Sequence, residues 1–204
     1  HRVTDIWRSP SKGSLLMYDY QELVDDSDPN TLVITEYIFN ALDAFGIKTG
    51  ACHTELALVP SRGPILIEVN PRVAGEVRTS NKIHGWHGQD QIHWLALSIA
   101  APDKFQQAYT IPNANTDCVV VFLKSSVFGY LNTSELVQLR KSLESFFEFG
   151  RGLSPNRRVA VVPTVDLVTS PGVIMLVGPT AWKDYQTIRL VEPLLYTSRN
   201  LQFY

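Results

Sequence analysis

GPILIEVNPR, residues 63–72, starts as an apolar strand and then places a single carboxylate, Glu68, among the apolar side chains. Asn70 and Arg72 follow at two-residue steps. An ionised carboxylate in an apolar run is costly unless something compensates its charge. The stretch therefore predicts a strand that carries a binding site, and the rest of that site should be encoded nearby.

A second strand, ACHTELALVP (51–60), is predicted directly before this one, with a tight turn at Ser61 and Arg62. Such a turn sets Glu55 directly opposite Glu68, because side chains alternate across a strand and paired strands run in register. Like charges at opposed positions destabilise a strand pair. A protein tolerates them when a cation lies between them or when one carboxyl stays protonated.

The residues on this predicted face favour a cation. Glu55, Glu68 and Asn70 offer two carboxylates and an amide oxygen, which are hard ligands suited to Mg²⁺ or Mn²⁺. These ions usually share their site with substrate phosphates. Arg72 lies just past the strand end, where a guanidinium can clamp a phosphoryl or carboxylate group. The set predicts metal-assisted phosphoryl transfer.

A plainer interpretation competes with this one. A single glutamate in a strand is usually a solvent-facing residue, and the predicted register is an assumption. A slip of one residue would move a whole face of the strand to the other side.

At these residues the chain resembles a known family. HTELAL (53–58) followed by GPILIEVNPRVAG (63–75) is similar to the second half of the ATP-grasp fold. That resemblance implies that Glu55, Glu68 and Asn70 hold Mg²⁺ against the phosphates of ATP. It also implies that Arg72 contacts the transferred phosphate or an acyl-phosphate intermediate.

Three further segments, 3–7, 42–55 and 164–177, are most similar to the L-amino-acid ligase branch of that superfamily. The resemblance implies an enzyme that uses ATP and a small carboxylate or amino-acid substrate to form a C–N bond. A biotin-carboxylase-like enzyme, a purine-pathway enzyme and a non-catalytic binding domain with the same fold remain alternatives.

ATP-grasp enzymes hold the nucleotide between two subdomains, the first of which supplies lysines and a glycine-rich flap. The sequence contains no counterpart of that subdomain. We therefore expect the C-terminal portion of such an enzyme, with the rest of it upstream, and we expect these 204 residues alone to be catalytically inert.

The order of elements predicts an α+β fold, an ATP-grasp C-terminal half with mixed or antiparallel sheet flanked by helices. Residues 1–113 are assigned to that half, which carries the site, and residues 114–204 to a small α+β subdomain. Asn132 and Glu135 form a capping-box pattern, and a hairpin is predicted over residues 157–180. The predicted helices cover residues 31–46, 91–100, 132–150 and about 181–196.

Three residues are further candidates for the substrate side of the site. His53 shares a face with Glu55 and would touch substrate or phosphate, or only pack beside the site. Gly75 would let backbone N–H groups approach an anion or form a turn. Arg78 would bind a substrate carboxylate or remain an exposed loop residue.

Other titratable groups carry weaker signals. His84, His87 and His93 with Asp90 have irregular spacing for a zinc site, and an aromatic substrate-side loop fits them better. The basic loop 150–158 is expected to be solvated, or else to contact an anionic substrate. Cys52 and Cys118 lack a motif and are predicted to be small buried apolar groups.

Composition excludes several classes. The net charge of −2 provides no basic footprint for nucleic acid, and no apolar run reaches the roughly 18–20 residues of a membrane helix. Two cysteines fit a reducing compartment, so a cytoplasmic location is expected. The oligomeric state, a homodimer included, is left open.

Overall fold

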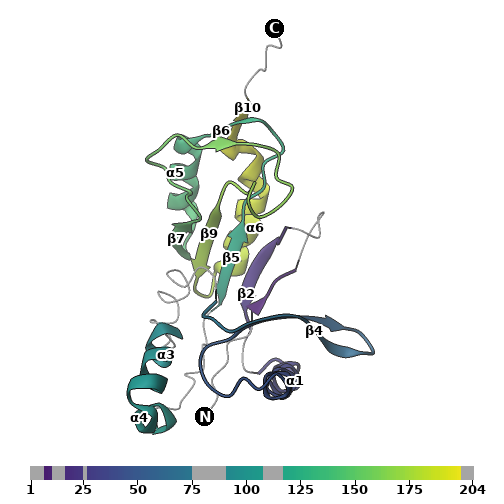
Figure 1. Cartoon of the computed structure of the whole chain (residues 1–204). Helices are drawn as coiled ribbons and strands as arrows, with labels where there is room; N and C mark the ends of the chain where they lie inside the picture. Colours follow the sequence, from purple (N-terminus) through teal and green to yellow (C-terminus); the bar gives the residue numbers. More distant parts are fainter. Residues whose placement is uncertain (1–6, 11–16, 25–26, 75–90, 108–116, 199–204) are drawn as a thin grey trace. The chain divides into compact units, whose positions relative to one another are not determined.

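The computed structural model describes residues 7–10, 17–24, 27–74, 91–107 and 117–198. Helices and largely antiparallel strands alternate along the chain, which makes the protein α+β as predicted (Figure 1). Within the residues so described, no helix has the length and apolar character needed to cross a membrane.

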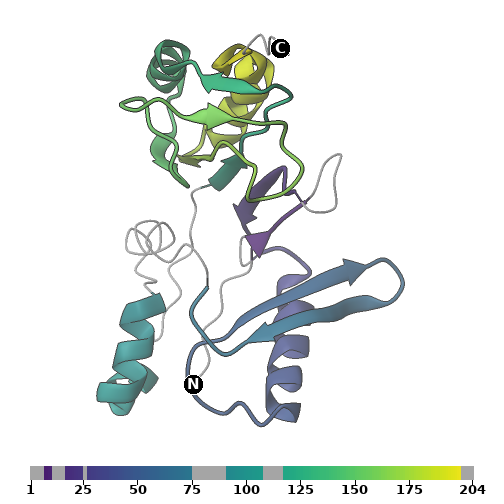
Figure 2. The ribbon, with the colours of Figure 1, turned by 45° about the horizontal axis from the view of Figure 1, so that its top comes forward.

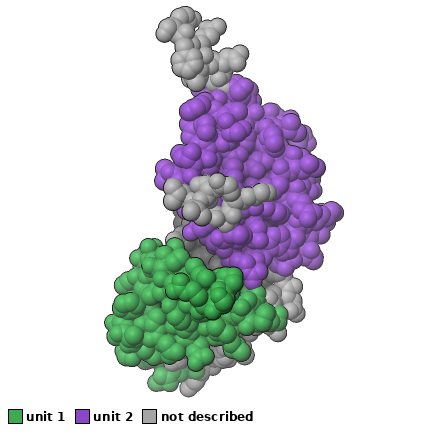
Figure 3. Space-filling view, turned by 90° about the vertical axis from the view of Figure 1, so that its right-hand side faces the viewer, with its two compact units in different colours: residues 1–6, 24–114 green, residues 7–23, 115–204 purple. Residues whose placement is uncertain are grey.

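The chain divides into two compact units (Figure 3). Unit 1 comprises residues 1–6 and 24–114, and unit 2 comprises residues 7–23 and 115–204. The segment 7–23 thus belongs to the same unit as the C-terminal third of the chain.

The described residues of unit 1 form one hairpin and three helices. The strands β3 (His53–Val59) and β4 (Gly63–Asn70) form a two-stranded antiparallel sheet. The helices are α1 (Thr31–Ala44), α3 (Gln91–Ala100) and α4 (Pro102–Gln107). The hairpin lies across α1, which contacts β4 (Figure 2).

Helix α1 forms where the four-residue repeat of apolar side chains predicts it. It ends at Ala44, two residues before Gly46, whose φ of 74° lies in the left-handed region that glycine adopts without strain. The hydroxyl of Tyr37 accepts a hydrogen bond from the backbone N–H of Leu66 at 3.0 Å, which ties α1 to β4. No described residue of unit 1 is fully buried. Every residue of unit 1 whose burial is described is therefore at least partly exposed to solvent.

Unit 2 contains a five-stranded antiparallel sheet in the order β1-β2-β5-β9-β7. The strands are β1 (Trp7–Arg8), β2 (Tyr20–Leu23), β5 (Cys118–Phe122), β9 (Val173–Val177) and β7 (Phe146–Gly150). Strands β5 and β9 are buried along their whole length. Such continuous apolar runs are typical of central strands covered on both faces.

A second, three-stranded sheet in the order β10-β6-β8 joins Tyr196–Ser198, Gly129–Leu131 and Ala160–Val161. A Cβ on Gly129 would clash with the carbonyl oxygen of Thr197 on the paired strand. Only glycine therefore permits the close approach of β6 to β10 at this position.

Two helices cover the core of unit 2. They are α5 (Thr133–Ser142) and α6 (Ala181–Val191), and the 3₁₀ helix η1 (Glu192–Leu195) continues α6. Helix α6 lies against β5 and β9 (Figure 1). The core side chains include Val119, Val121, Leu136, Leu139, Ile174, Leu176 and Ile188.

The helix predicted over residues 132–150 is wrong in its second half. The side chain of Asn132 caps α5 by accepting from the backbone N–H of Glu135, as predicted, but the helix ends at Ser142. Leu143 is extended, and the aromatic segment 146–150 forms strand β7. Aromatic residues favour the half-buried surface of a sheet, and pairing with β9 outweighs the helical continuation.

The predicted hairpin over residues 157–180 is also wrong. Strand β8 pairs with β6, whereas β9 pairs with β5 and β7. The segment between β8 and β9 makes hydrogen bonds to Ser125 and within itself. The backbone N–H of Thr164 donates to the carbonyl of Ser125, and the carboxylate of Asp166 accepts from the N–H and hydroxyl of Thr169. The bonds between Asp166 and Thr169 close a turn within the segment. The strands at its two ends, β8 and β9, therefore belong to different sheets.

The last predicted helix stops earlier than expected. The α-helix ends at Val191, and the following turn is 3₁₀ before β10 begins at Tyr196. Pro193 explains the change, because proline has no N–H to donate and its ring crowds the carbonyl four residues before it.

Candidate metal and phosphate site

The hairpin places Glu55 directly opposite Glu68, as the sequence predicts. The neighbouring pairs are Thr54 with Val69 and His53 with Asn70. The predicted register at the candidate site is confirmed.

The turn that produces this register differs from the predicted one. Val59 pairs with Gly63, so the connection is a three-residue loop rather than a tight turn at Ser61 and Arg62. Ser61 and Gly63 have positive φ angles of 63° and 78°. From this loop, a regular ladder would set Glu55 opposite a residue other than Glu68.

A β-bulge corrects the register inside the hairpin. The ladder shifts between Glu55 and Leu56, which pairs with Leu66, so Ile67 is the extra residue in β4. Ile67 is 65% exposed. The bulge therefore brings the two carboxylates together and turns an apolar side chain outward.

Three potential metal ligands converge at this point of the hairpin. His53, Glu55 and Glu68 each offer one ligand atom, and these atoms all lie within 4.8 Å of one another. Bonds to Mg²⁺ are about 2.1 Å long, so two ligands on opposite sides of one ion are about 4.2 Å apart. The cluster therefore fits a single divalent ion after a small movement of side chains.

Solvent reaches one side of the cluster. His53 and Glu55 are half-buried, whereas Glu68 is exposed. The side-chain amide of Asn70 donates a hydrogen bond to Glu68. Asn70 thus already contacts the carboxylate, and rotation of its amide would present the oxygen in place of the nitrogen.

Arg72 lies just beyond β4 and is exposed. Its Nη1 donates to the carbonyl of Val73 at 2.9 Å, and its backbone N–H donates to the carbonyl of Asn70 at 2.8 Å. The local turn therefore fixes the backbone of Arg72 against that of Asn70, the neighbour of Glu68.

Several predicted residues lie outside the described part of the chain, namely Gly75, Arg78, His84, His87 and Asp90. His93 is exposed on α3 beside Trp94. The backbone N–H of Ala74 donates to the side chain of Gln91 at 3.2 Å, which connects the end of the β4 segment to the start of α3.

The two cysteines differ. Cys118 is buried in β5, and burial raises the pKa of its thiol to about 12. Cys52 is only half-buried, against the prediction, and burial raises the pKa of its thiol as well. Neither thiol is therefore activated as a nucleophile.

The arginines of the basic loop contact their own unit. Arg151 donates to the carbonyl of Leu167 at 3.1 Å and Arg157 to that of Gly152 at 2.6 Å. The guanidinium of Arg158 lies 3.6 Å from the ring centre of Tyr130. These contacts favour a structural role for the loop.

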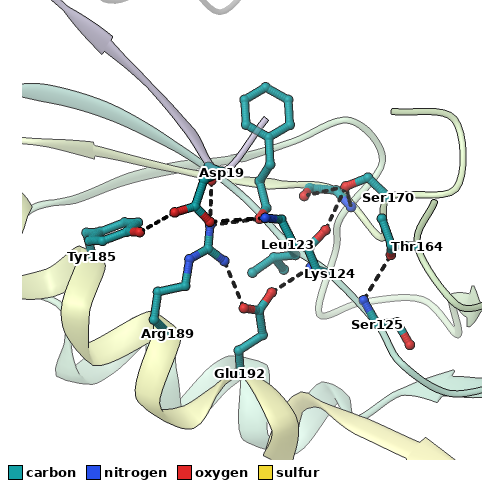
Figure 4. Close-up of polar contacts among 11 residues, drawn as sticks. Asp19, Leu123, Lys124, Ser125, Thr164, Ser170, Tyr185, Arg189 and Glu192 are labelled. Atoms are coloured by element: carbon teal, nitrogen blue, oxygen red, sulfur yellow. Dashed lines mark hydrogen bonds and ion pairs between the residues drawn. The ribbon is translucent and has the colours of Figure 1, made fainter. Parts of the chain in front are cut away.

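A buried polar network in unit 2 was not predicted from the sequence (Figure 4). Its centre is Asp19, which is 6% exposed and precedes β2. Lys124 Nζ and Arg189 Nη2 each lie 3.1 Å from Asp19 Oδ1. The hydroxyl of Tyr185 donates to Asp19 Oδ2 at 2.6 Å.

Arg189 connects this carboxylate to a second one. Its Nη1 donates to Glu192 Oε2 at 2.8 Å, and its Nη2 donates to the carbonyl of Phe122 at 3.0 Å. The backbone N–H of Lys124 donates to Glu192 Oε1 at 2.6 Å. The network joins β5, α6 and η1 to the segment before β2, so it is structural. A sequence signal existed only in part, as the i, i+3 pair Arg189 and Glu192.

The pKa values of these two carboxyls are shifted in opposite directions. Burial alone would raise the pKa of Asp19, but the Tyr185 hydroxyl and the charges of Arg189 and Lys124 hold it below its ordinary value. Burial raises the pKa of Glu192 despite the neighbouring Arg189.

Asp19 should therefore make the stability of unit 2 depend on pH. Its folded pKa is below the unfolded value of about 3.9, so its stabilising effect is complete above that value and disappears as pH falls through the folded pKa. We expect the stability difference between the wild type and Asp19→Asn to be constant above about pH 5 and to shrink below about pH 4. Urea unfolding from pH 3 to 7 measures this difference, and a gap that widens on acidification would contradict the assignment. Glu192 is present in both proteins, so its own titration largely cancels.

The chain was compared with known proteins in sequence and in structure. No family model matches the chain. Over 194 residues it is 29% identical to Dapdiamide A synthase from Enterobacter agglomerans, and the match covers 91% of this chain and 44% of that protein.

Two solved structures have a similar fold. The L-amino acid ligase from Bacillus licheniformis has a TM-score of 0.68 at 17% identity, over 96% of this chain and 50% of that one. Phosphoribosylglycinamide synthetase from Anaerococcus prevotii has a TM-score of 0.59 at 13% identity, over 91% of this chain and 46% of that one.

These relatives are ATP-grasp enzymes, so the predicted ATP-grasp fold is confirmed. In sequence the chain is similar to Dapdiamide A synthase, and in fold it is similar to the L-amino acid ligase and to phosphoribosylglycinamide synthetase. It spans about half the length of the relatives that it matches.

Proposed function

We propose that this chain supplies the metal and phosphate site of an ATP-dependent carboxylate–amine ligase. The observation that carries the proposal is the register of the hairpin, in which a bulge at Ile67 sets Glu55 opposite Glu68. A strand pair retains opposed carboxylates most readily when a cation holds them.

In the proposed reaction, the γ-phosphoryl group of ATP passes to a substrate carboxylate, with release of ADP. An amine then attacks the acyl carbon, and phosphate leaves as the C–N bond forms. Glu55, Glu68 and Asn70 would hold Mg²⁺, which would neutralise charge on the phosphates. Arg72 would stabilise the negative charge on the transferring group. Gly75 and Arg78 would approach the substrate from the segment that follows β4.

An amino acid is the proposed carboxylate substrate. The relatives that support it are the Dapdiamide A synthase and the L-amino acid ligase. A purine-pathway ligase is the second candidate, supported by the similarity to phosphoribosylglycinamide synthetase. Nucleotide hydrolysis by the enzyme that contains this chain separates the two. An amino-acid ligase should hydrolyse ATP when amino acids alone are added, whereas a phosphoribosylglycinamide synthetase needs a phosphoribosyl amine as well as glycine.

The proposal predicts that Glu68→Gln has opposite effects with and without metal. In the absence of divalent ions the variant should be more stable than the wild type by roughly 0.2–1 kcal/mol, because the repulsion from Glu55 is gone. With saturating Mg²⁺ or Mn²⁺ the wild type should gain stability and the variant should not. Thermal unfolding with and without the ion measures both effects.

Glu36→Gln is the matched control, since it makes the same chemical change at an exposed position of α1 in the same unit. It should follow the wild type under both conditions. If the ions change neither protein and Glu68→Gln changes nothing, the opposed carboxylates are not a metal site. A metal-independent loss of stability in Glu68→Gln would instead indicate a structural role.

A further inference from the structure

We propose that His53 is a nitrogen ligand of the ion held by Glu55 and Glu68, and that it makes the site prefer Mn²⁺ to Mg²⁺. The inference rests on the proposed function, because it needs the two carboxylates to bind an ion. The inference adds a nitrogen ligand to the proposed oxygen ligands, and it predicts which ion the site prefers.

The position of His53 follows from the strand geometry. It lies two residues before Glu55 in β3, so both side chains are on one face. It pairs with Asn70, which contacts Glu68. A ligand atom of the imidazole lies within 4.8 Å of an oxygen atom of each carboxylate. All three side chains therefore reach one ion without a change in the backbone.

The hydrogen bonding of His53 also favours this role. Its Nδ1 is buried and has no hydrogen-bond partner among the described residues. A buried polar atom normally has a partner, and a metal-bound histidine normally donates its other N–H to an oxygen. Binding of Nδ1 to the ion would give this buried atom the partner that it lacks. The other nitrogen, Nε2, would then donate to solvent or substrate.

The ligand set determines the preference. Mg²⁺ is bound almost entirely by oxygen, whereas imidazole suits first-row transition ions. Two carboxylates and an imidazole therefore bind Mn²⁺ more tightly than an all-oxygen set would, with less gain for Mg²⁺. Without His53 the difference between the two ions should become smaller.

Binding of Mn²⁺ to the 204-residue chain is followed by the loss of the free-ion electron paramagnetic resonance signal, and binding of Mg²⁺ by competition. We expect His53→Gln to weaken Mn²⁺ binding about tenfold while Mg²⁺ binding changes little. The spin-echo modulation from a directly bound ¹⁴N should be present in the wild type and absent in the variant. His93→Gln makes the same change on α3, outside the ligand set, and should match the wild type in all three measurements.

His53→Asp provides the second variant. It replaces the nitrogen by a carboxylate, so it should keep Mn²⁺ bound without the ¹⁴N signature and with a reduced preference for Mn²⁺. Equal weakening of both ions in His53→Gln, or a ¹⁴N signature that persists in it, would overturn the inference. If Glu68→Gln abolishes binding of both ions and His53→Gln changes nothing, the inference alone fails. If Glu68→Gln also changes nothing, the proposed function fails with it.

Discussion

Replacing Arg189 by methionine is expected to lower the free energy of unfolding of unit 2 by about 3–5 kcal/mol. The guanidinium lies between two buried carboxylates, Asp19 and Glu192. It also donates to the backbone carbonyls of Asp19 and Phe122. Methionine keeps much of the apolar stem of the side chain and removes its charge. Asp19 and Glu192 would then remain buried without the guanidinium that pairs with both.

Amide hydrogen exchange of β5 and β9 measures this loss, because these fully buried strands report the global opening of unit 2. Lys183→Met is the matched control on the same helix. The side chain of Lys183 is 72% exposed and lies 3.8 Å from Glu144, so its removal should change the stability by less than about 1 kcal/mol. Comparable effects of the two variants would contradict a central role for Arg189.

A double variant identifies the origin of the loss. If the cost of Arg189→Met comes from an uncompensated charge on Asp19, adding Asp19→Asn should cost less in that background than in the wild type. Strict additivity of the two changes would show that the residues act independently.

Replacing Asp184 by alanine is expected to destabilise unit 2 by about 3 kcal/mol. Asp184 is 2% exposed in α6, and its Oδ2 accepts from the backbone N–H of Ser145 at 2.7 Å and from its hydroxyl at 2.6 Å. The carbonyl of Ser145 in turn accepts from the N–H of Val177 at 2.8 Å. Alanine would leave two buried donors without an acceptor at the point where α6, β7 and β9 meet.

Urea unfolding measures the change, and the denaturant slope should stay constant if only the folded state is affected. Gln186→Ala is the control, because Gln186 is exposed on the same helix and alanine is a good helix former. It should lie within about 0.5 kcal/mol of the wild type. A loss of similar size in Gln186→Ala would mean that the effect of Asp184→Ala is not specific to the contact with Ser145.

The candidate chemistry and these stabilising contacts lie in different units. Unit 1 has no fully buried described residue, so little apolar burial holds the hairpin in place. A bound ion that links His53, Glu55 and Glu68 would therefore contribute noticeably to its stability. Unit 2 is stabilised instead by its apolar core and by the buried groups around Asp19 and Asp184.

Local sequence patterns predicted an element correctly where neighbouring residues specify its structure. The apolar repeat and Gly46 predicted α1, and Asn132 predicted the start of α5. Local patterns failed where distant pairing competed with them. The aromatic segment 146–150 continues a helical pattern in sequence, but its pairing with β9 makes it a strand.

For the candidate site, the sequence by itself determined which kinds of side chain are available. The segments HTELAL and GPILIEVNPR contain two glutamates, an asparagine and a following arginine. Strand alternation is enough to put Glu68 and Asn70 on one side. The family resemblance also rests on these residues, and the comparisons agree with it.

Only the tertiary structure decided how those groups meet. The three-residue loop after Val59 would set Glu55 against the wrong residue, and the bulge at Ile67 restores the pairing with Glu68. A bulge costs one unpaired residue in the ladder and has no strict sequence signature. The contact of Asp19 with Arg189, which are 170 residues apart, could not be predicted from the sequence for a related reason. Periodicity reports which face a residue occupies, whereas the partner across that face depends on how the whole chain returns to it.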